Sequence, residues 1–288
     1  MLQMVKYYNR LGVKVHINNP FIKYDVSIVY RLPSKQFYLL IKYLRNRSSM
    51  IYFDAVVNYF EKHNHATDKH IYYQRKIADN CDGIICATDN IAASARKFNG
   101  NIFVMDDPVD TEYFDIIKHT LNYCNPIFGW SGVSSKALEL NKYADIINNR
   151  INIISDKRAL SIDFCFNFSF YEWRYETFKN NILRCDIALL PRSIIGDHYN
   201  NGHSSFKALV FAVSGIPIIA NRIPSYEKLK DYFNGVVFIE DYGGDIKLCM
   251  EALAGSGPIN AHPARAKYSC ENQAKALMSF IHGSSGYV

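Results

Sequence analysis

One stretch in the second half of the chain decides the fold. It reads Cys185-Asp186-Ile187-Ala188-Leu189-Leu190-Pro191, then Gly202-His203-Ser204-Ser205-Phe206-Lys207, and then Ser214-Gly215-Ile216-Pro217-Ile218-Ile219-Ala220-Asn221. The two apolar runs predict buried strands, and the segment between them predicts a loop followed by a helix. Continuous apolar strands separated by a helix indicate a parallel sheet covered on both faces.

The same alternation continues toward both ends of the chain. In the first part we expect a helix over residues 2–11 that ends at Gly12, and strands over residues 13–17, 25–30, 50–54, 83–88 and 102–105. In the second part we expect strands over residues 127–130, 151–155, 162–166, 187–190, 216–220 and 236–239. A chain of 288 residues has the length of two domains, which we place at residues 1–120 and 121–288. The expected fold class is therefore α/β, with two α/β/α domains.

Composition excludes several classes of protein. The 49% hydrophobic content supports large cores, yet no apolar run approaches the roughly 20 residues that span a bilayer. The net charge of +6 is small and mixed in sign, so we expect no nucleic-acid partner. The N-terminal residues lack the features of a secretory signal, and the seven cysteines are dispersed without a CxxC pair. We therefore expect a cytoplasmic protein with reduced cysteines and no zinc site.

The segment before Lys207 predicts an anion-binding site. A helix that begins at Ser204 or Ser205 would present free backbone amides to the preceding loop, with Lys207 one turn into the helix. Gly202 would permit the close approach of a ligand, and His203 lies beside the loop. The alternative is a serine-capped buried helix whose lysine merely extends its aliphatic stem toward solvent.

A second loop, Gly129-Trp130-Ser131-Gly132, follows the first strand of the second domain and precedes a helix. Loops at the carboxyl ends of parallel strands open into one crevice, so this loop and Lys207 can contact the same ligand. An ordinary strand-to-helix turn would show the same spacing. The chain contains neither GxxxxGK[ST] nor GxGxxG, which disfavours ATPases and dehydrogenases, and we expect no cofactor.

Residues 172–176, 185–191, 205–209 and 214–220 follow one another in an order that resembles the C-terminal half of bacterial glycosyltransferases of the GT-B fold, of the glycosyl transferases group 1 type. Residues 84–88 and 101–114 look like the end of that family's N-terminal domain, so the resemblance covers most of residues 50–255. It implies two Rossmann-like domains and transfer of a sugar from a nucleotide-sugar donor to a glycan or lipid-linked acceptor. A role in bacterial surface polysaccharide (capsule, O-antigen) or glycolipid biosynthesis is the corresponding expectation.

The resemblance also implies where the donor binds. The matching positions in the C-terminal domain are Gly129, Trp130, Ser131, Gly132, Gly202, His203, Ser204, Ser205 and Lys207. Fixed amides and a lysine can stabilise the negative charge of a departing nucleoside diphosphate without a metal. No D-x-D motif occurs in the chain, which agrees with metal-independent transfer.

Two features depart from the family pattern. Many retaining members carry two glutamates eight residues apart, the second of which usually holds the donor ribose, and the matching positions here are Gly202 and Val210. A valine cannot accept hydrogen bonds from ribose hydroxyls. The first strand of the N-terminal domain is also missing from the pattern, which should expose the edges of neighbouring strands.

The catalytic base should come from the N-terminal domain, as a histidine or carboxylate at a strand end. Asp54 ends the expected strand over residues 50–54 and fits best, although it could instead cap a helix. His16 ends an earlier expected strand and is the second candidate, with an ordinary strand-end histidine as the alternative.

Residues 1–76 carry 13 basic and 4 acidic side chains, and residues 35–47 combine basic residues with an apolar stripe. This segment could contact anionic lipid at the inner face of the cell membrane, or simply pack one side on the sheet. Two rival functions fit the same sequence, a catalytically silent partner subunit of the same fold and a nucleotide-sugar epimerase of the same architecture.

Overall fold

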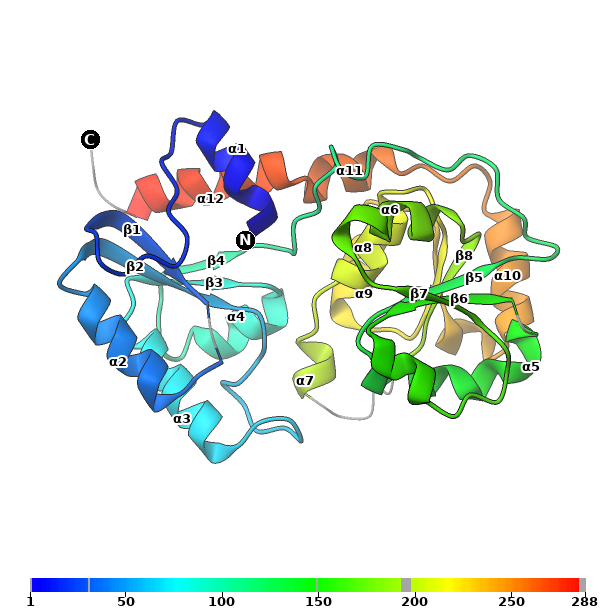
Figure 1. Cartoon of the computed structure of the whole chain (residues 1–288), viewed down its shortest axis with the longest axis horizontal. Coiled ribbons are helices and arrows are strands. Elements are labelled where there is room, and N and C mark those ends of the chain that lie inside the picture. The colour runs from blue at the N-terminus through cyan, green and yellow to red at the C-terminus, as the bar shows by residue number, and fades with distance from the viewer. Residues whose placement is uncertain (1, 31, 149, 193–197, 285–288) are drawn as a thin grey trace. The chain divides into compact units, whose positions relative to one another are not determined.

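A computed structural model describes residues 2–30, 32–148, 150–192 and 198–284 (Figure 1). Within these residues the chain forms two compact units. Unit 1 contains residues 2–108, 198–204 and 270–284, and unit 2 contains residues 109–192 and 205–269. The division thus falls at Val109 and not near residue 120, and the last helix belongs to unit 1 although its sequence follows unit 2.

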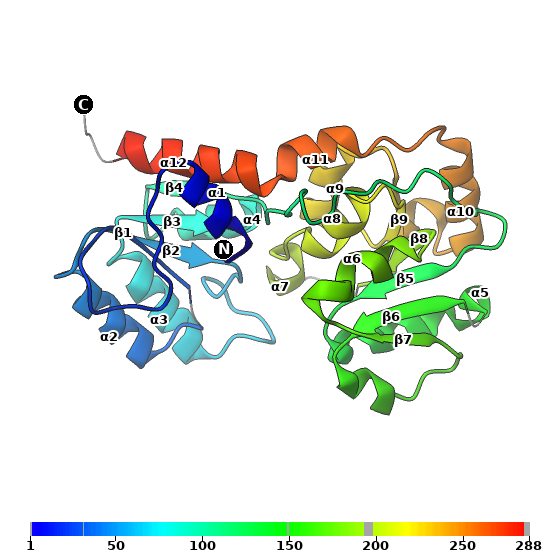
Figure 2. The ribbon, with the colours of Figure 1, turned by 45° about the horizontal axis from the view of Figure 1, so that its top comes forward.

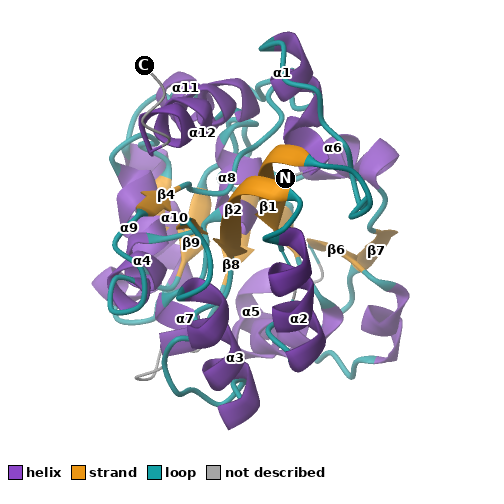
Figure 3. Cartoon of the chain, turned by 90° about the vertical axis from the view of Figure 1, so that its left-hand side faces the viewer, coloured by secondary structure: helices purple, strands orange, loops and turns teal. Residues whose placement is uncertain are grey.

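Unit 1 is built on a parallel sheet in the order β1 (Tyr24–Val29), β2 (Ser48–Ala55), β3 (Gly83–Cys86) and β4 (Ile102–Val104). Each new strand is added on the same side of the last, so right-handed connections place their helices on one face. These helices are α2 (Lys35–Leu44), α3 (Asp68–Ala78) and α4 (Asp89–Ala95). The other face is covered by η1 (Leu2–Met4), α1 (Val5–Arg10) and α12 (Cys270–Ser284), as Figure 3 shows.

The two faces of the unit 1 sheet have separate cores because side chains alternate along each strand. On β2, Ile51 and Phe53 belong to the cluster beneath α2, α3 and α4. Tyr52 belongs to the cluster beneath α1 and α12, together with Ile85 of β3. By the same alternation Asp54 lies on the side of α1 and α12.

Unit 2 is built on a six-stranded parallel sheet in the order β10-β9-β8-β5-β6-β7. Its strands are β5 (Phe128–Ser131), β6 (Ile151–Ser155), β7 (Ser169–Glu172), β8 (Ile187–Leu190), β9 (Ile218–Ala220) and β10 (Val236–Phe238). The chain adds β6 and β7 on one side of β5, and then returns to add β8, β9 and β10 on the other side. Reversal of direction places connecting helices on both faces, which makes this a doubly wound sheet (Figure 2).

The helices of unit 2 fill these connections. They are η2 (Ser134–Tyr143), α5 (Ala144–Ile147), η3 (Lys157–Ser161), α6 (Tyr175–Leu183), α8 (Phe206–Ala212), α9 (Pro224–Lys230), η4 (Ile239–Tyr242), α10 (Ile246–Gly255) and α11 (His262–Tyr268). The short helix α7 (His198–Asn201), although it comes between β8 and β9 in sequence, belongs to unit 1. The expected α/β class with two parallel sheets is confirmed.

Two expected strands are wrong. Residues 13–17 form no strand, and Val13 and Val15 instead pack against the cluster beneath α1 and α12. Residues 162–166 also form no strand, and β7 begins later, at Ser169. Here the side chain of Asn141 donates to the carbonyl of Asp163 and accepts from the backbone N–H of Cys165, so these backbone groups are satisfied without β6.

The segment that follows β4 is fixed to unit 2, which explains the position of the division. Arg265 of α11 donates hydrogen bonds to the carbonyls of Thr111 at 2.9 Å and Val213 at 2.8 Å, and also to that of Phe114. Lys118 Nζ lies 2.8 Å from a carboxylate oxygen of Asp186, the residue before β8. Unit 2 therefore begins well before its first strand. In the part of the chain that the structure describes, every helix is too short or too polar to cross a membrane.

Candidate functional site

The candidate site lies in unit 2 where β5 and β8 are neighbours and the chain leaves them in opposite directions, the position at which open α/β sheets bind ligands. Gly132 follows the carboxyl end of β5, and Lys207 lies in the first turn of α8. A β-carbon on Gly132 would lie 2.3 Å from Lys207 Nζ, so the absence of a side chain makes room for the ammonium. The two loops therefore meet at this edge of the sheet.

Lys207 is held over an aromatic ring and is half-buried. Its Nζ lies 4.9 Å from the centroid of the Trp130 ring, and Trp130 itself is buried. The pKa of Lys207 is lowered to about 7, first by burial and then by the positive charge of Arg192, while the negative charge of Glu139 opposes the shift. Among the residues that the structure describes, none forms a hydrogen bond or an ion pair with this ammonium. Its charge is available to an anion.

The turn at Gly132 is fixed by the carboxyl end of β6. Ser155 donates its hydroxyl to the carbonyl of Gly132 at 2.7 Å. The carboxylate of Asp156 accepts from both the backbone N–H and the hydroxyl of Ser134, each at 3.1 Å. Arg158 and Ser134 hold the pKa of Asp156 well below its usual range, so this carboxylate stays ionised. Two side chains that the sequence analysis did not select therefore position the glycine turn.

The other expected donor residues of β5 have structural roles. Gly129 is needed for packing, because a β-carbon there would lie 2.6 Å from Cys185 Sγ and 2.9 Å from the Phe211 ring. Ser131 is buried within β5. Of this loop, Gly132 and the ring of Trp130 are the parts in contact with Lys207.

The expected donor residues of the second loop are divided between the units. Gly202, His203 and Ser204 belong to unit 1, whereas Ser205 and Lys207 belong to unit 2. The helix begins at Phe206, and Ser205 precedes it without a capping hydrogen bond from its side chain. The helix thus starts directly after Ser205, and the alternative interpretation, a helix capped by the side chain of this serine, is wrong.

Gly202 is tightly packed within unit 1. Its carbonyl accepts a hydrogen bond from the hydroxyl of Thr88 at 3.3 Å, and a β-carbon there would lie 3.1 Å from that of Asn58. The ring of Tyr199 in the same segment lies 4.3 Å, centroid to centroid, from that of His65. The close contacts of Gly202 with its neighbours in unit 1 are enough to account for a glycine at this position.

Val210 is fully enclosed in the core of unit 2, with 1% of its surface exposed. It lies on α8 one turn after Lys207. Its side chain is apolar and its carbonyl accepts a hydrogen bond from the hydroxyl of Ser214. This position therefore contributes no side-chain acceptor to the candidate site.

Asp54 is the buried acid of unit 1. It lies one residue before the carboxyl end of β2 and is 9% exposed. The pKa of Asp54 is raised from 3.8 to about 7, chiefly by burial and also by the negative charge of Asp107. Burial likewise raises the pKa of Asp107. A hydrogen bond from the side chain of Ser204 favours the charged form and opposes this rise. The sequence analysis did not select Asp107, and the only signal for it was its place two residues after the expected strand over residues 102–105.

His16 does not share this edge of the sheet. Its ring lies 5.9 Å from that of Tyr24, the first residue of β1, and it is exposed. Tyr24 is in register with Ser48 of the parallel neighbour β2, so six residues separate that level from Asp54, or about 20 Å at 3.3 Å per residue. The two expected base candidates therefore lie at opposite ends of the strands.

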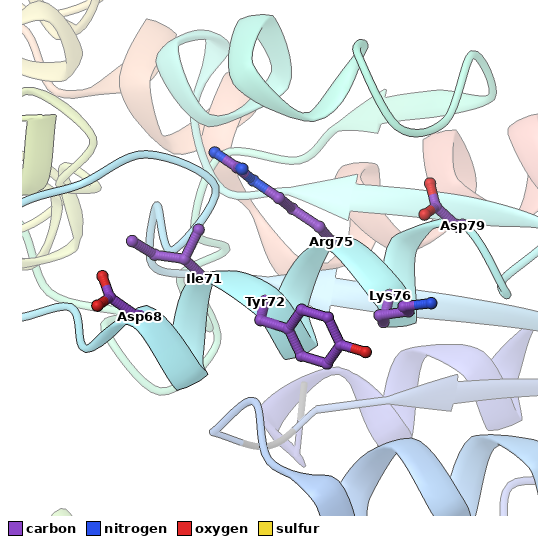
Figure 4. Close-up of a pocket in the computed structure, with 6 residues that line it drawn as sticks. All are labelled: Asp68, Ile71, Tyr72, Arg75, Lys76 and Asp79. Carbon is purple, nitrogen blue, oxygen red and sulfur yellow. The ribbon is translucent and has the colours of Figure 1, made fainter.

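A shallow hollow elsewhere in unit 1 does not make a site. Its six lining residues, Asp68, Ile71, Tyr72, Arg75, Lys76 and Asp79, come from α3 and the residue that follows it (Figure 4). Arg75 is occupied by the carbonyl of Phe60, to which its Nη2 donates at 2.6 Å. Two acids and two bases offset one another there. In the described residues, no three His, Cys, Asp or Glu side chains are grouped to hold a metal ion.

Comparisons with solved structures extend over both units. The chain is similar to HepE from Anabaena in complex with UDP-glucose (TM-score 0.65, 10% identity, covering 90% of this chain and 79% of that one). It is similar to TarM (TM-score 0.62, 15% identity, covering 96% of this chain and 57% of that one). It is also similar to sucrose-phosphate synthase from Thermosynechococcus elongatus (TM-score 0.60, 11% identity, covering 96% of this chain and 75% of that one). The chain thus spans little more than half of TarM. No protein-family model matches the sequence, and no curated protein matches it significantly.

Proposed function

We propose that this chain, which has the GT-B fold shared by the glycosyltransferases it resembles, transfers a sugar from a nucleotide-sugar donor to an acceptor hydroxyl. The observation that carries the proposal is the position of Lys207, beside Gly132 and over Trp130, where β5 and β8 meet. This is the position at which a doubly wound sheet binds nucleotides.

The donor diphosphate would lie against Lys207 in unit 2. Negative charge develops on the diphosphate as the bond from its oxygen to the anomeric carbon breaks. Arg192 and Lys136 raise the positive potential around Lys207, as their effect on its pKa indicates. We therefore assign stabilisation of the leaving group to these side chains and propose transfer without a metal ion.

Asp54 would accept the proton of the acceptor hydroxyl as its oxygen bonds to the anomeric carbon. With a pKa of about 7, its carboxylate is available near neutral pH and remains basic enough to take up a proton. Its position near the carboxyl end of β2 suits a group that faces a ligand. His16, at the opposite end of the strands, has no part in this proposal.

For the acceptor we propose a glycan or a lipid-linked sugar of a bacterial surface polysaccharide or glycolipid, reached from the cytoplasm. Two of the similar structures were solved with bound ligands that fit such chemistry, HepE with UDP-glucose and TarM with UDP and α-GlcNAc-glycerol. The basic N-terminal segment, with a net charge of +9 over residues 1–76, supports an acceptor at an anionic membrane surface.

One observation favours a second function. Val210 supplies no side-chain acceptor for a ribose, and it is enclosed in the core. A partner subunit that has the fold and binds a nucleotide weakly, without transfer, would tolerate this residue. Binding of donor analogues with no turnover across many acceptors would favour that function, and isomerisation of a donor in the absence of any acceptor would favour an epimerase.

The first experiment is a thermal-shift measurement on the folded protein with UDP, GDP, CMP and dTDP and their sugars. A ligand that binds only the folded state raises the melting temperature in proportion to ln(1 + [L]/Kd). We expect one nucleotide to raise it, and Lys207→Met to abolish the shift. Lys230→Met is the matched control, because Lys230 Nζ also lies over an aromatic ring of unit 2, that of Phe238 at 5.4 Å. If no nucleotide shifts the folded protein, donor binding at Lys207 is wrong.

A further inference from the structure

The basic segment over residues 35–47 is not the amphipathic membrane helix that its sequence allows. Phe37, Ile41 and Leu44 form the apolar stripe of α2, and all three are buried against the sheet of unit 1. Any contact with lipid must therefore come from the opposite side of α2.

That opposite side carries large apolar side chains that nothing covers in the described part of unit 1. Leu39 and Tyr43, one turn apart on α2, are 52% and 40% exposed. Phe21, in the loop before β1, is 76% exposed, more than any other large apolar side chain that the structure describes. Isolated exposed residues need no explanation, but residues gathered on one surface do.

Arg47 joins these residues into one surface. Its Nη1 donates to the carbonyl of Phe21 at 2.5 Å, and its guanidinium lies 5.0 Å from the centroid of the Tyr43 ring. The backbone carbonyl of Arg47 accepts a hydrogen bond from the backbone N–H of Tyr24 at 2.8 Å. This bond holds the end of the loop before β1 beside Arg47. The loop before β1 and the outer side of α2 are therefore neighbours. We call Phe21, Leu39, Lys42, Tyr43 and Arg47 the basic aromatic surface.

The charge around the basic aromatic surface has one sign. No aspartate or glutamate occurs from Val26 to Phe53, whereas this stretch contains two lysines and three arginines. Arg45 is neutralised by Asp82, with its Nη1 2.6 Å from the carboxylate. In the described residues no carboxylate pairs with Lys35, Lys42 or Arg47. Aromatic rings set among unpaired cations fit the boundary between an anionic headgroup layer and its acyl chains.

We infer that the basic aromatic surface binds an anionic lipid bilayer, with Phe21, Leu39 and Tyr43 entering the interface and Lys42 and Arg47 contacting lipid phosphates. A partner protein would be expected to bring carboxylates of its own to such a patch, whereas a bilayer supplies many phosphates to a surface of no fixed shape. Binding of this kind would bring the proposed transferase to a lipid-linked acceptor, although it does not depend on catalysis.

The test is co-sedimentation of the full chain with vesicles. Vesicles of phosphatidylcholine alone are compared with vesicles that contain roughly one third phosphatidylglycerol. We expect binding to the anionic vesicles only, and its loss in about 1 M salt, where charges more than about 3 Å apart are screened. Failure of the folded protein to bind anionic vesicles at low salt would overturn the inference.

Two double variants locate the binding surface. Lys35→Glu with Lys42→Glu reverses two unpaired exposed charges, and Phe21→Ser with Leu39→Ser removes two apolar contacts. Each pair should lower the affinity for anionic vesicles by about tenfold or more. Each side chain that enters the interface or is attracted by lipid phosphates raises the affinity by a factor of roughly three to ten. Equal binding by either pair would show that the basic aromatic surface is not the contact.

The matched control lies on α3, where Lys76 Nζ is 5.6 Å from the centroid of the exposed Tyr72 ring (Figure 4). Tyr72→Ser with Lys76→Glu makes the same kind of change beside Asp68 and Asp79, outside the basic aromatic surface. It should leave vesicle binding unchanged, and an equal loss would mean that net charge alone drives it. All variants should keep the nucleotide-induced thermal shift, so failure of this inference is distinguishable from failure of the proposed function.

Discussion

The ammonium of Lys207 lies 4.9 Å from the centroid of the buried Trp130 ring, and a glycine leaves the space into which it extends. The ring attracts the cation. Burial and the positive charge of Arg192 disfavour it, and the pKa of Lys207 is lowered to about 7. A lysine with this pKa changes its charge near neutral pH.

Donor binding should therefore be linked to proton uptake at Lys207. A bound diphosphate favours the charged lysine, so above pH 7 binding takes up a proton and affinity falls as pH rises. Calorimetry at pH 8 in two buffers of different ionisation enthalpy should detect uptake approaching one proton. Lys207→Arg keeps its charge at this pH and should abolish the uptake, whereas identical heats in both buffers for the natural protein would contradict the shift.

Replacement of Asp54 by asparagine should stabilise the protein at high pH and slow transfer. The folded-state pKa of about 7 lies above the ordinary 3.8, so between these two values the folded state keeps a proton that the unfolded state has released, and stability falls as pH rises from 3.8 to about 7. The melting temperature of Asp54→Asn relative to the natural protein should be higher at pH 8 than at pH 5. Loss of the base should lower the transfer rate about a hundredfold or more. A relative melting temperature that does not change with pH would show that Asp54 is not buried as an acid.

Gly132→Ala should weaken donor binding with little effect on folding. The added carbon would lie 2.3 Å from Lys207 Nζ, the far end of a flexible side chain, so the lysine moves and the backbone stays. We expect the nucleotide-induced thermal shift to be lost. Gly255→Ala is the matched control in unit 2, because a β-carbon there meets nothing within 4 Å. A thermal shift that survives in Gly132→Ala would separate this glycine from the donor site.

Arg265→Met should destabilise unit 2. The guanidinium satisfies the carbonyls of Thr111, Phe114 and Val213, and a methionine of similar length leaves all three without this donor. Hydrogen bonds to charged groups contribute about 1.5–3 kcal/mol each, although partial access of water offsets part of the loss. Urea denaturation should show a decrease of about 2–4 kcal/mol in the free energy of unfolding. Lys267→Met, two residues away, should change it by less than about 1 kcal/mol.

The sequence predicted the parts of the fold that depend on local patterns. Apolar runs such as residues 187–190 identify buried strands because both faces of a parallel sheet are covered. The meeting of the Gly132 turn with the helix of Lys207 also follows, since strand ends of one parallel sheet share an edge. These inferences needed no knowledge of distant contacts.

The errors come from contacts between residues that are distant in sequence. Alternating apolar residues over 162–166 look like a strand, but the side chain of Asn141 satisfies their backbone in place of β6. The membership of Gly202 in unit 1 depends on its contacts with Asn58 and Thr88. The raised pKa of Asp107 depends on burial, which no local pattern of the chain encodes.

Because α12 completes unit 1 after the chain has passed through unit 2, neither unit corresponds to one continuous piece of gene. Cys270, Ala274 and Leu277 of this helix pack with Tyr52 and Ile85 of the unit 1 sheet. Recombination at a single point near residue 120 would join the sheet of one parent to the covering helix of another. New donor specificities should therefore arise more readily by substitution around Lys207 than by exchange of whole modules between relatives.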